Sequence, residues 1–339
     1  MKMILNIVLP TVAAIIMAAA CTPLEPAAPR PGAFPSIEEK TTGSFADGET
    51  YVVHRAASDK PYVIIFLPDG YTRAELTPDG PFMRVVREAT DAIFSEEPLC
   101  RMKDMVEVRV RFLATSKSGV GSPDSRFKVS LDHYNILSYD KDAAVSFAIP
   151  GITAERFKHS TIVIIPNSTE RPGVTRISGV FPDVSTVSIL APSTPELNRK
   201  YDYLRFGILH EVVGHGIGLL SDEYANINAD ASGAVDFSAI QLSSFIQNVW
   251  PAASGAPWEK YIGLPGYGDT GYFEGGCNYK KGIWRSSEVS IMTYEHDRCP
   301  SFNAVSREAI HRRVCEANGI AWTWEKFLEF DREYVLGKK

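Results

Sequence analysis

Two histidines five residues apart, with a glutamate directly after the first, are the residues of this 339-residue chain best suited to chemistry. The segment is His210-Glu211-Val212-Val213-Gly214-His215. Imidazole nitrogens suit Zn²⁺, and a carboxylate next to a zinc ligand can take a proton from zinc-bound water as a general base. His210 and His215 are therefore candidate zinc ligands, and Glu211 is a candidate general base.

The spacing of the two histidines does not fit a regular α-helix. Residues four apart lie about 40° apart around the helix axis, whereas residues five apart lie about 140° apart. A single widened turn, a π-bulge, absorbs one residue and returns both imidazoles to one face, and such bulges cluster at functional sites. Glycines at positions 214, 216 and 218 lower the cost of this distortion. We therefore predict a widened turn over residues 212–214.

The elements that must position this motif are strands and helices in alternation. Four short strands are predicted, over residues 63–67, 106–112, 161–165 and 186–190. The first and third are continuous apolar runs, as expected of strands covered on both faces. Helices are predicted over residues 82–94, from a Ser193/Thr194 cap through the histidine motif, and over 303–317 and 324–334. Interleaved elements of this kind predict a layered α/β domain.

A longer string around the motif resembles a known family. Residues 210–224 are similar to the bacterial IgA-peptidase family of zinc metallopeptidases, in which small residues and Asp-Glu-Tyr follow a histidine pair. The six-residue motif alone also resembles the HELLGH signature of dipeptidyl peptidase III. Further segments that look like the IgA-peptidase family occur in one order at residues 67–72, 118–120, 167–169, 273–276, 281–285, 290–292 and 302–307. The resemblance covers about residues 61–316. It implies a metzincin-like α/β sandwich with a twisted mixed sheet, an active-site helix and a mostly helical C-terminal part with a Met-turn.

The resemblance also implies a third zinc ligand. Metallopeptidases with a glycine turn after the second histidine usually place a His or Asp a few residues on, and Asp222 lies seven residues after His215. Asp222 is the favoured ligand, with Glu223 and His296 as alternatives. Asp222 could instead only cap the following loop.

A methionine segment completes the implied site. Residues 290–294 resemble the Met-turn of metzincins, which places a methionine beneath the zinc histidines. Tyr294 is then a candidate catalytic residue that stabilises the oxyanion of the tetrahedral intermediate. A core methionine beside a packed tyrosine would give the same sequence.

Four cysteines remain once Cys21 is set aside: Cys100, Cys277, Cys299 and Cys315. In an exported chain they allow three pairings, between which the sequence does not choose. Cys277 and Cys299 bracket the methionine segment, so their disulfide is the preferred pairing.

The N-terminus is typical of an exported protein. Lys2 precedes an apolar stretch that ends in three alanines directly before Cys21, which resembles the lipobox of bacterial lipoproteins. We predict a lipoprotein-type signal peptide over residues 1–20, a proline-rich tether over 21–45 and the zinc metallopeptidase domain over 46–339. A lipid anchor on Cys21 would place the protein in the bacterial cell envelope. An ordinary signal peptide, and hence secretion, is the alternative.

The composition of the chain argues against some classes of protein. A formal net charge of −6, with 45% hydrophobic and 22% charged residues, is typical of a globular chain and gives no sign of nucleic-acid binding. The sequence thus predicts a monomeric, exported zinc endopeptidase that acts on a peptide or protein substrate and has Zn²⁺ as its cofactor. An extended substrate is expected to add as a further strand along an edge formed by residues 186–190. Two alternatives stay open. One is an inactive zinc-containing surface lipoprotein that binds host protein or glycan, and the other is a purely structural metal.

Overall fold

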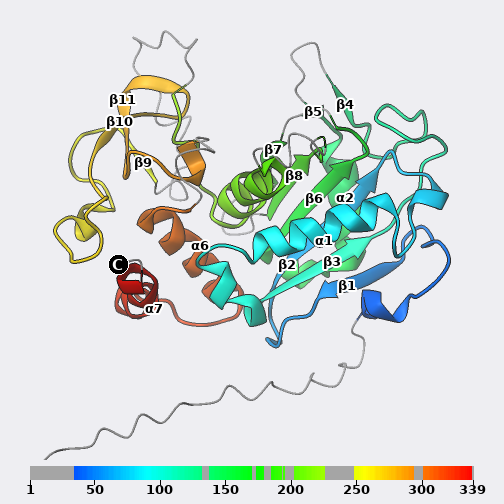
Figure 1. The fold of residues 1–339 in the computed structure, drawn as a ribbon, viewed down its shortest axis with the longest axis horizontal. Helices are drawn as coiled ribbons and strands as arrows, with labels where there is room; N and C mark the ends of the chain where they lie inside the picture. Colours follow the sequence, from blue (N-terminus) through cyan, green and yellow to red (C-terminus); the bar gives the residue numbers. More distant parts are fainter. Residues whose placement is uncertain are drawn as a thin grey trace, which may run out of the picture. The chain divides into compact units, whose positions relative to one another are not determined.

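The structure, a computed structural model, describes residues 34–131, 137–169, 173–178, 185–192, 194, 202–225, 248–293 and 301–337. These residues form a mixed α/β fold built on a six-stranded sheet of order β1-β3-β2-β6-β8-β7 (Figure 1). The strands of this sheet are β1 (Thr50–His54), β2 (Tyr62–Asp69), β3 (Val106–Arg111), β6 (Ser160–Pro166), β7 (Gly173–Ser178) and β8 (Ser185–Leu190). All four strands predicted from the sequence are therefore confirmed.

The sheet is parallel in its centre and antiparallel at its edges. Strands β3, β2, β6 and β8 run parallel, whereas β1 pairs with β3, and β7 with β8, in the antiparallel sense. Parallel strands are normally covered on both faces, which explains the continuous apolar runs of β2 and β6. Every residue of these two strands is buried.

Helices cover both faces of the sheet (Figure 1). Helix α1 (Pro81–Ile93) connects β2 to β3 and packs with the helix that carries the histidine motif over one face, where Ile64 and Phe66 contribute to the core. Helix α2 (Lys141–Ile152) covers the other face, packing its Phe147 with Ile65 of β2. The result is a three-layer arrangement whose main core lies between the sheet and the layer formed by α1 and the helix with the histidine motif.

The C-terminal part holds two helices and a small sheet. Helices α6 (Ala304–Ala317) and α7 (Trp324–Gly337) confirm the two predicted helices. Strands β9 (Val249–Trp250), β10 (Phe273–Gly276) and β11 (Tyr279–Arg285) form a three-stranded antiparallel sheet that the sequence did not predict. An aromatic cluster that includes Trp258, Tyr261 and Phe327 forms the core of this part.

The remaining elements are short. Strands β4 (Ser130–Leu131) and β5 (Leu137–Ser138) form a two-stranded sheet. The 3-10 helices are η1 (Ile37–Glu39), η2 (Arg73–Glu75), η3 (Leu99–Arg101), η4 (Lys103–Met105), η5 (Ala154–His159), η7 (Glu259–Tyr261) and η8 (Ile291–Thr293).

The folded unit begins at Phe34, ahead of the position near residue 45 that the proline pattern indicates. Ser36 forms a parallel bridge with Val52 at the β1 edge, and the side chains of Ile37 and Phe45 are buried in the core. The last part of the predicted tether therefore packs onto the domain. The predicted signal peptide, Cys21 and the rest of the tether lie outside the described residues.

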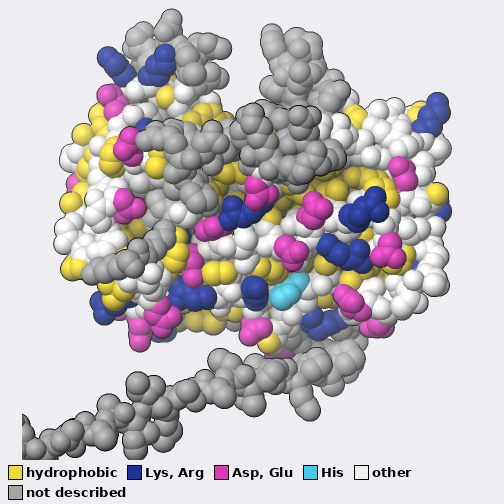
Figure 2. All heavy atoms as spheres, viewed as in Figure 1, with side chains coloured by type: hydrophobic (Ala, Val, Ile, Leu, Met, Phe, Trp, Pro, Cys, Tyr) yellow, Lys and Arg dark blue, Asp and Glu magenta, His cyan; other side chains and the backbone are white. Residues whose placement is uncertain are grey.

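Two surface properties of the described residues bear on function. Among them, no helix is both long enough and apolar enough to cross a membrane. Figure 2 shows acidic and basic side chains interspersed over one face of the molecule, so neither sign of charge dominates that face.

Candidate metal centre

The helix that carries the histidine motif is widened, as its spacing requires. A short α-helix, α4 (Tyr203–Gly207), continues directly as the π-helix η6 (Ile208–Ile217). Near its end the Gly218 N–H donates to the carbonyl of Val213, five residues back, at 2.9 Å. In this i→i+5 pattern His210 and His215 lie about one turn apart. The distortion differs from the predicted single turn over residues 212–214, because it extends over ten residues.

The predicted start of this helix falls mostly outside the described residues. Thr194 has no regular secondary structure, and Ser193 and residues 195–201 lie outside the described residues. The described helix begins at Tyr203, after Asp202, whose φ of 51° is left-handed.

Hydroxyl groups on the sheet hold the widened helix. The hydroxyls of Thr175 and Ser188 lie 2.9 and 3.3 Å from the carbonyl oxygen of Glu211. Those of Thr186 and Tyr62 donate to the carbonyl oxygen of Gly216 at 3.0 and 3.3 Å. These donors come from three strands of the sheet, β2, β7 and β8. Because buried carbonyls need partners, this row of hydroxyls favours a register in which the helix exposes the Glu211 and Gly216 carbonyls to the sheet.

Two glycines let the widened helix approach its neighbours. A Cβ at Gly216 would lie 2.8 Å from Cγ2 of Thr161, closer than real carbon atoms pack. A Cβ at Gly214 would collide with the sulfur of Met292. The glycines expected to ease the distortion therefore act mainly through close packing.

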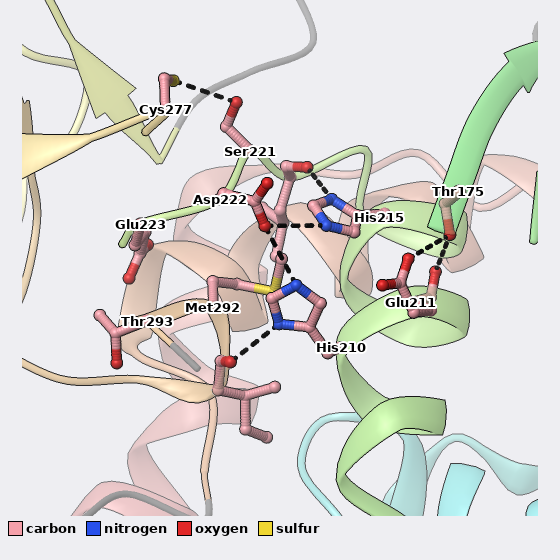
Figure 3. Close-up of polar contacts among 12 residues, drawn as sticks. Thr175, His210, Glu211, His215, Ser221, Asp222, Glu223, Cys277, Met292 and Thr293 are labelled. Atoms are coloured by element: carbon pink, nitrogen blue, oxygen red, sulfur yellow. Dashed lines mark hydrogen bonds and ion pairs between the residues drawn. The ribbon is translucent and has the colours of Figure 1, made fainter. Parts of the chain in front are cut away.

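The widened helix brings His210 and His215 to one carboxylate (Figure 3). The Nε2 atoms of the two histidines lie 3.1 and 3.2 Å from Oδ1 of Asp222. One ligand atom from each of the three residues lies within 4.8 Å of the others, and among the described residues this is the one such group of three or more His, Cys, Asp or Glu side chains. Asp222 thus occupies the third position expected from the sequence.

Two of the three separations in this group match those between ligands of a small tetrahedral cation. Two ligands held at about 2.1 Å from a tetrahedral ion are about 3.4 Å apart, close to both nitrogen-to-oxygen separations. Nδ1 of His210 lies 3.0 Å from the carbonyl oxygen of Ile291, and Nδ1 of His215 lies 2.6 Å from that of Leu220. Each Nδ1–H therefore donates to a backbone carbonyl, which leaves the Nε2 atoms available to bind a cation, as is usual for metal-binding histidines.

Charge in the group is strongly coupled. Burial alone would lower the pKa of His215, but the carboxylate of Asp222 outweighs it and raises that pKa to about 9. Burial would likewise raise the pKa of Asp222, yet the two imidazoles hold it well below its usual range. Binding of a cation by this group would therefore release a proton from His215.

The glutamate after the first histidine is placed on the strand side of the group. Figure 3 shows Glu211 beside Thr175 of β7, whose hydroxyl lies 2.9 Å from Oε2 of Glu211. A Cβ on Gly173 would lie 2.5 Å from Cγ of Glu211, so the strand leaves room for this side chain only because residue 173 is glycine. The carboxylate of Glu211 is therefore held between the helix and the edge strand.

A buried turn supports the first histidine from below. Helix η8 carries Met292, which is fully buried and contacts Gly214, while the neighbouring carbonyl of Ile291 binds His210. The N–H of Glu223 donates to the carbonyl of Met292 at 2.8 Å, joining this turn to the loop that carries Asp222.

The other sequence candidates separate from the group. Glu223, proposed as an alternative third ligand, turns its carboxylate to Asn248, Ser290 and Asn303 instead. Tyr294, His296 and Cys299 lie outside the described residues. Cys277 is a free cysteine, so the expected disulfide with Cys299 is not formed; its sulfur lies 3.4 Å from the hydroxyl of Ser221.

Sequence reasoning missed the row of hydroxyls that binds the helix. Its signal is present in residues 185–190, where Thr186 and Ser188 alternate with apolar residues although the whole strand is buried. Polar side chains on one face of a buried strand indicate that the element packed on that face has polar backbone groups that need hydrogen-bond partners.

Comparison with known proteins adds no assignment. No protein-family model matches the chain, and no curated protein matches it.

Proposed function

We propose that this protein is a zinc-dependent endopeptidase. One observation carries the proposal: two histidines of a widened helix and Asp222 converge within ligand distance, with a glutamate directly after the first histidine. The side chain of His210 is 2% exposed, whereas those of His215 and Asp222 are 18% and 23% exposed. The group is therefore accessible from the His215 and Asp222 side, where a substrate can approach.

The residues have distinct tasks in this proposal. His210, His215 and Asp222 would hold the zinc ion. Zinc, when bound, supplies a water of lowered pKa and an electrostatic sink for the negative charge of the tetrahedral intermediate. Glu211 accepts the proton of the attacking water and passes it to the leaving amine, while Thr175 orients its carboxylate. Tyr294, two residues after Met292, is the proposed oxyanion donor.

The methionine turn supports a metzincin-like assignment. Met292 packs against Gly214, and the turn supplies a carbonyl to His210, which are the contacts expected of a Met-turn beneath zinc histidines. Together with the motifs quoted from the sequence, this turn supports the proposed kinship with the IgA-peptidase family.

The substrate is proposed to be an extended peptide. Strand β8, which the sequence suggested as the substrate-binding edge, lies between β6 and β7 and offers no edge. Among the described strands, β7 lies at the edge on that side, and it carries Thr175 and Gly173, which contact Glu211. A peptide added to β7 as a further strand would run past the general base.

The proposed location is the cell envelope, through a lipid on Cys21. In a bacterial host the full-length chain should fractionate with membranes and incorporate labelled fatty acid, because removal of the signal peptide would leave a lipid-bearing Cys21 as the N-terminal residue. Cys21→Ser should incorporate none. Label retained in this variant would contradict the lipid anchor.

The function itself is tested with Glu211→Gln. This variant should keep about one zinc per chain and lose at least about 10²-fold in peptide hydrolysis, since it removes the base but no ligand. Glu325→Gln, an exposed change on α7, is the matched control and should remain active. Unchanged turnover in Glu211→Gln would refute the mechanism. If the wild-type chain holds about one zinc but cleaves no peptide, the result would favour the alternative of an inactive surface lipoprotein that binds host protein or glycan.

A further inference from the structure

Glu223 is a fully buried carboxylate that directly follows Asp222 in the chain. Asp222 belongs to the metal group, by which we mean His210, His215 and Asp222. Its Oε1 accepts hydrogen bonds from Asn248 Nδ2 and Asn303 Nδ2, both at 3.0 Å. Its Oε2 accepts from Ser290 Oγ at 2.5 Å and from Asn303 Nδ2 at 3.1 Å. Burying a carboxylate is costly without such partners, so four hydrogen bonds at this position indicate a carboxylate with a specific task.

The partners of Glu223 come from three separate segments. Asn248 precedes β9, Ser290 precedes the methionine turn, and Asn303 caps the N-terminus of α6. Two of these segments also contact the loop that carries Asp222 or the methionine turn. The side-chain amide of Asn248 accepts the N–H of Ser221 and donates to its carbonyl, and Ser290 accepts the N–H of Met292. Glu223 therefore joins the loop before Asp222 and the turn below His210 at one point.

The backbone of Glu223 makes the same connection. Its N–H donates to the carbonyl of Met292, and the carbonyl of the preceding Asp222 accepts the N–H of Cys277 at 2.9 Å. Both the C=O and the N–H of the peptide bond between Asp222 and Glu223 are thereby hydrogen-bonded. The position of the Asp222 carboxylate between the two histidines thus depends on how residue 223 is held.

We infer that Glu223 is a positioning residue for the metal centre: its buried carboxylate fixes Asp222 between His210 and His215 and fixes the methionine turn beneath them. This inference rests on the proposed function, because it takes the three residues to be metal ligands. It assigns to Glu223 an indirect role in metal affinity in place of the direct ligand role considered from the sequence. Partners of this kind commonly contribute 10- to 100-fold in metal affinity.

The substitution Glu223→Gln tests this role. Asn303 Nδ2 lies 3.0 and 3.1 Å from the two carboxylate oxygens, so the new amide NH2 faces an N–H donor in either orientation. Glu308→Gln is the matched control, because Glu308 is also buried and accepts hydrogen bonds from Lys260 and Tyr261, but has no contact with the metal group.

The measurement is the zinc dissociation constant, obtained by competition with a chromophoric chelator, together with the absorption spectrum of the cobalt(II) form. We expect Glu223→Gln to bind zinc 10- to 100-fold more weakly than wild type and to change the cobalt spectrum, while Glu308→Gln changes neither. Thermal unfolding of both variants without metal controls for a general loss of stability. Equal zinc affinity in the two variants, with an unchanged cobalt spectrum, would overturn the inference.

A second variant covers the case in which Glu223→Gln does not fold. Ser290→Ala removes one donor to Glu223 and the acceptor of the Met292 N–H, and should weaken zinc binding several-fold. Wild-type affinity in Ser290→Ala would then overturn the inference. If the wild-type chain itself binds no zinc, the proposed function fails; if it binds zinc and the variants bind it equally well, only the role of Glu223 fails.

Discussion

A single methyl group on strand β7 should displace Glu211, the proposed general base, and leave the proposed zinc ligands in place. Gly173 lies on β7, and a Cβ added there would be 2.5 Å from Cγ of Glu211 and 2.9 Å from its Oε1. Carbon atoms in contact are normally at least about 3.5 Å apart, so the Glu211 side chain must move by about 1 Å in Gly173→Ala. The three atoms nearest to the added Cβ all belong to Glu211, and none belongs to His210, His215 or Asp222.

The size of the effect follows from that displacement. A misplacement of about 1 Å at a reacting group can cost about 10²-fold in rate, which corresponds to ~2.7 kcal/mol in the activation barrier. Overpacking adds a stability cost of about 1–3 kcal/mol. We therefore expect kcat for peptide hydrolysis to fall about 10²-fold while zinc stays near one per chain.

The assay compares Gly173→Ala with Gly268→Ala, where an added Cβ meets no atom within 4 Å. Steady-state hydrolysis of a fluorogenic peptide gives kcat, and metal analysis gives the zinc content. Gly268→Ala should match the wild type in both. Wild-type kcat in Gly173→Ala, or loss of its zinc, would refute the placement of Glu211 as the base.

Two further predictions concern stability, measured by urea unfolding. Gly216→Ala should destabilise the protein because its Cβ would lie 2.8 Å from Cγ2 of Thr161. Thr161→Ser removes that methyl group, so the double variant should be about 1 kcal/mol more stable than the sum of the two single effects. Strictly additive effects on the free energy of unfolding would contradict the contact. Burial raises the pKa of Asp69 to about 6, above its unfolded value of 3.8, so the folded state holds this proton more tightly than the unfolded one. The wild type should therefore lose up to ~3 kcal/mol relative to Asp69→Asn as the pH rises from 4 to 7, and an equal pH dependence in both proteins would contradict this.

Much of the fold could be predicted from local sequence patterns. The continuous apolar runs of β2 and β6 and the helical spacing of α1 gave the right elements, because burial on one or two faces leaves a periodic trace. Helix α2 was missed, since Pro150 and Gly151 near its end are typical of a loop. Strand order was beyond sequence patterns, and for this reason the edge was assigned to β8 and not to β7.

The candidate site was likewise predictable from the sequence only in part. The five-residue histidine spacing was enough to predict a widened helix, because two ligands must share one face. The extent of the widening was not predictable, since it depends on hydroxyls from strands distant in the chain, such as Tyr62 and Thr175. Glu223 and Asp222 have similar chemistry and adjacent positions, so only the tertiary partners of Glu223 separate the two carboxylates.

The central claim is that one zinc ion is bound by two histidines of a widened helix and by Asp222. X-ray absorption at the zinc edge of the loaded protein tests it most directly. We expect a first shell of nitrogen and oxygen only, at about 2.0–2.1 Å, with outer-shell scattering from two imidazoles that falls to one in His215→Ala. A sulfur shell at about 2.3 Å, which would place zinc at a free cysteine such as Cys277, or a spectrum without imidazole scattering, would contradict the claim.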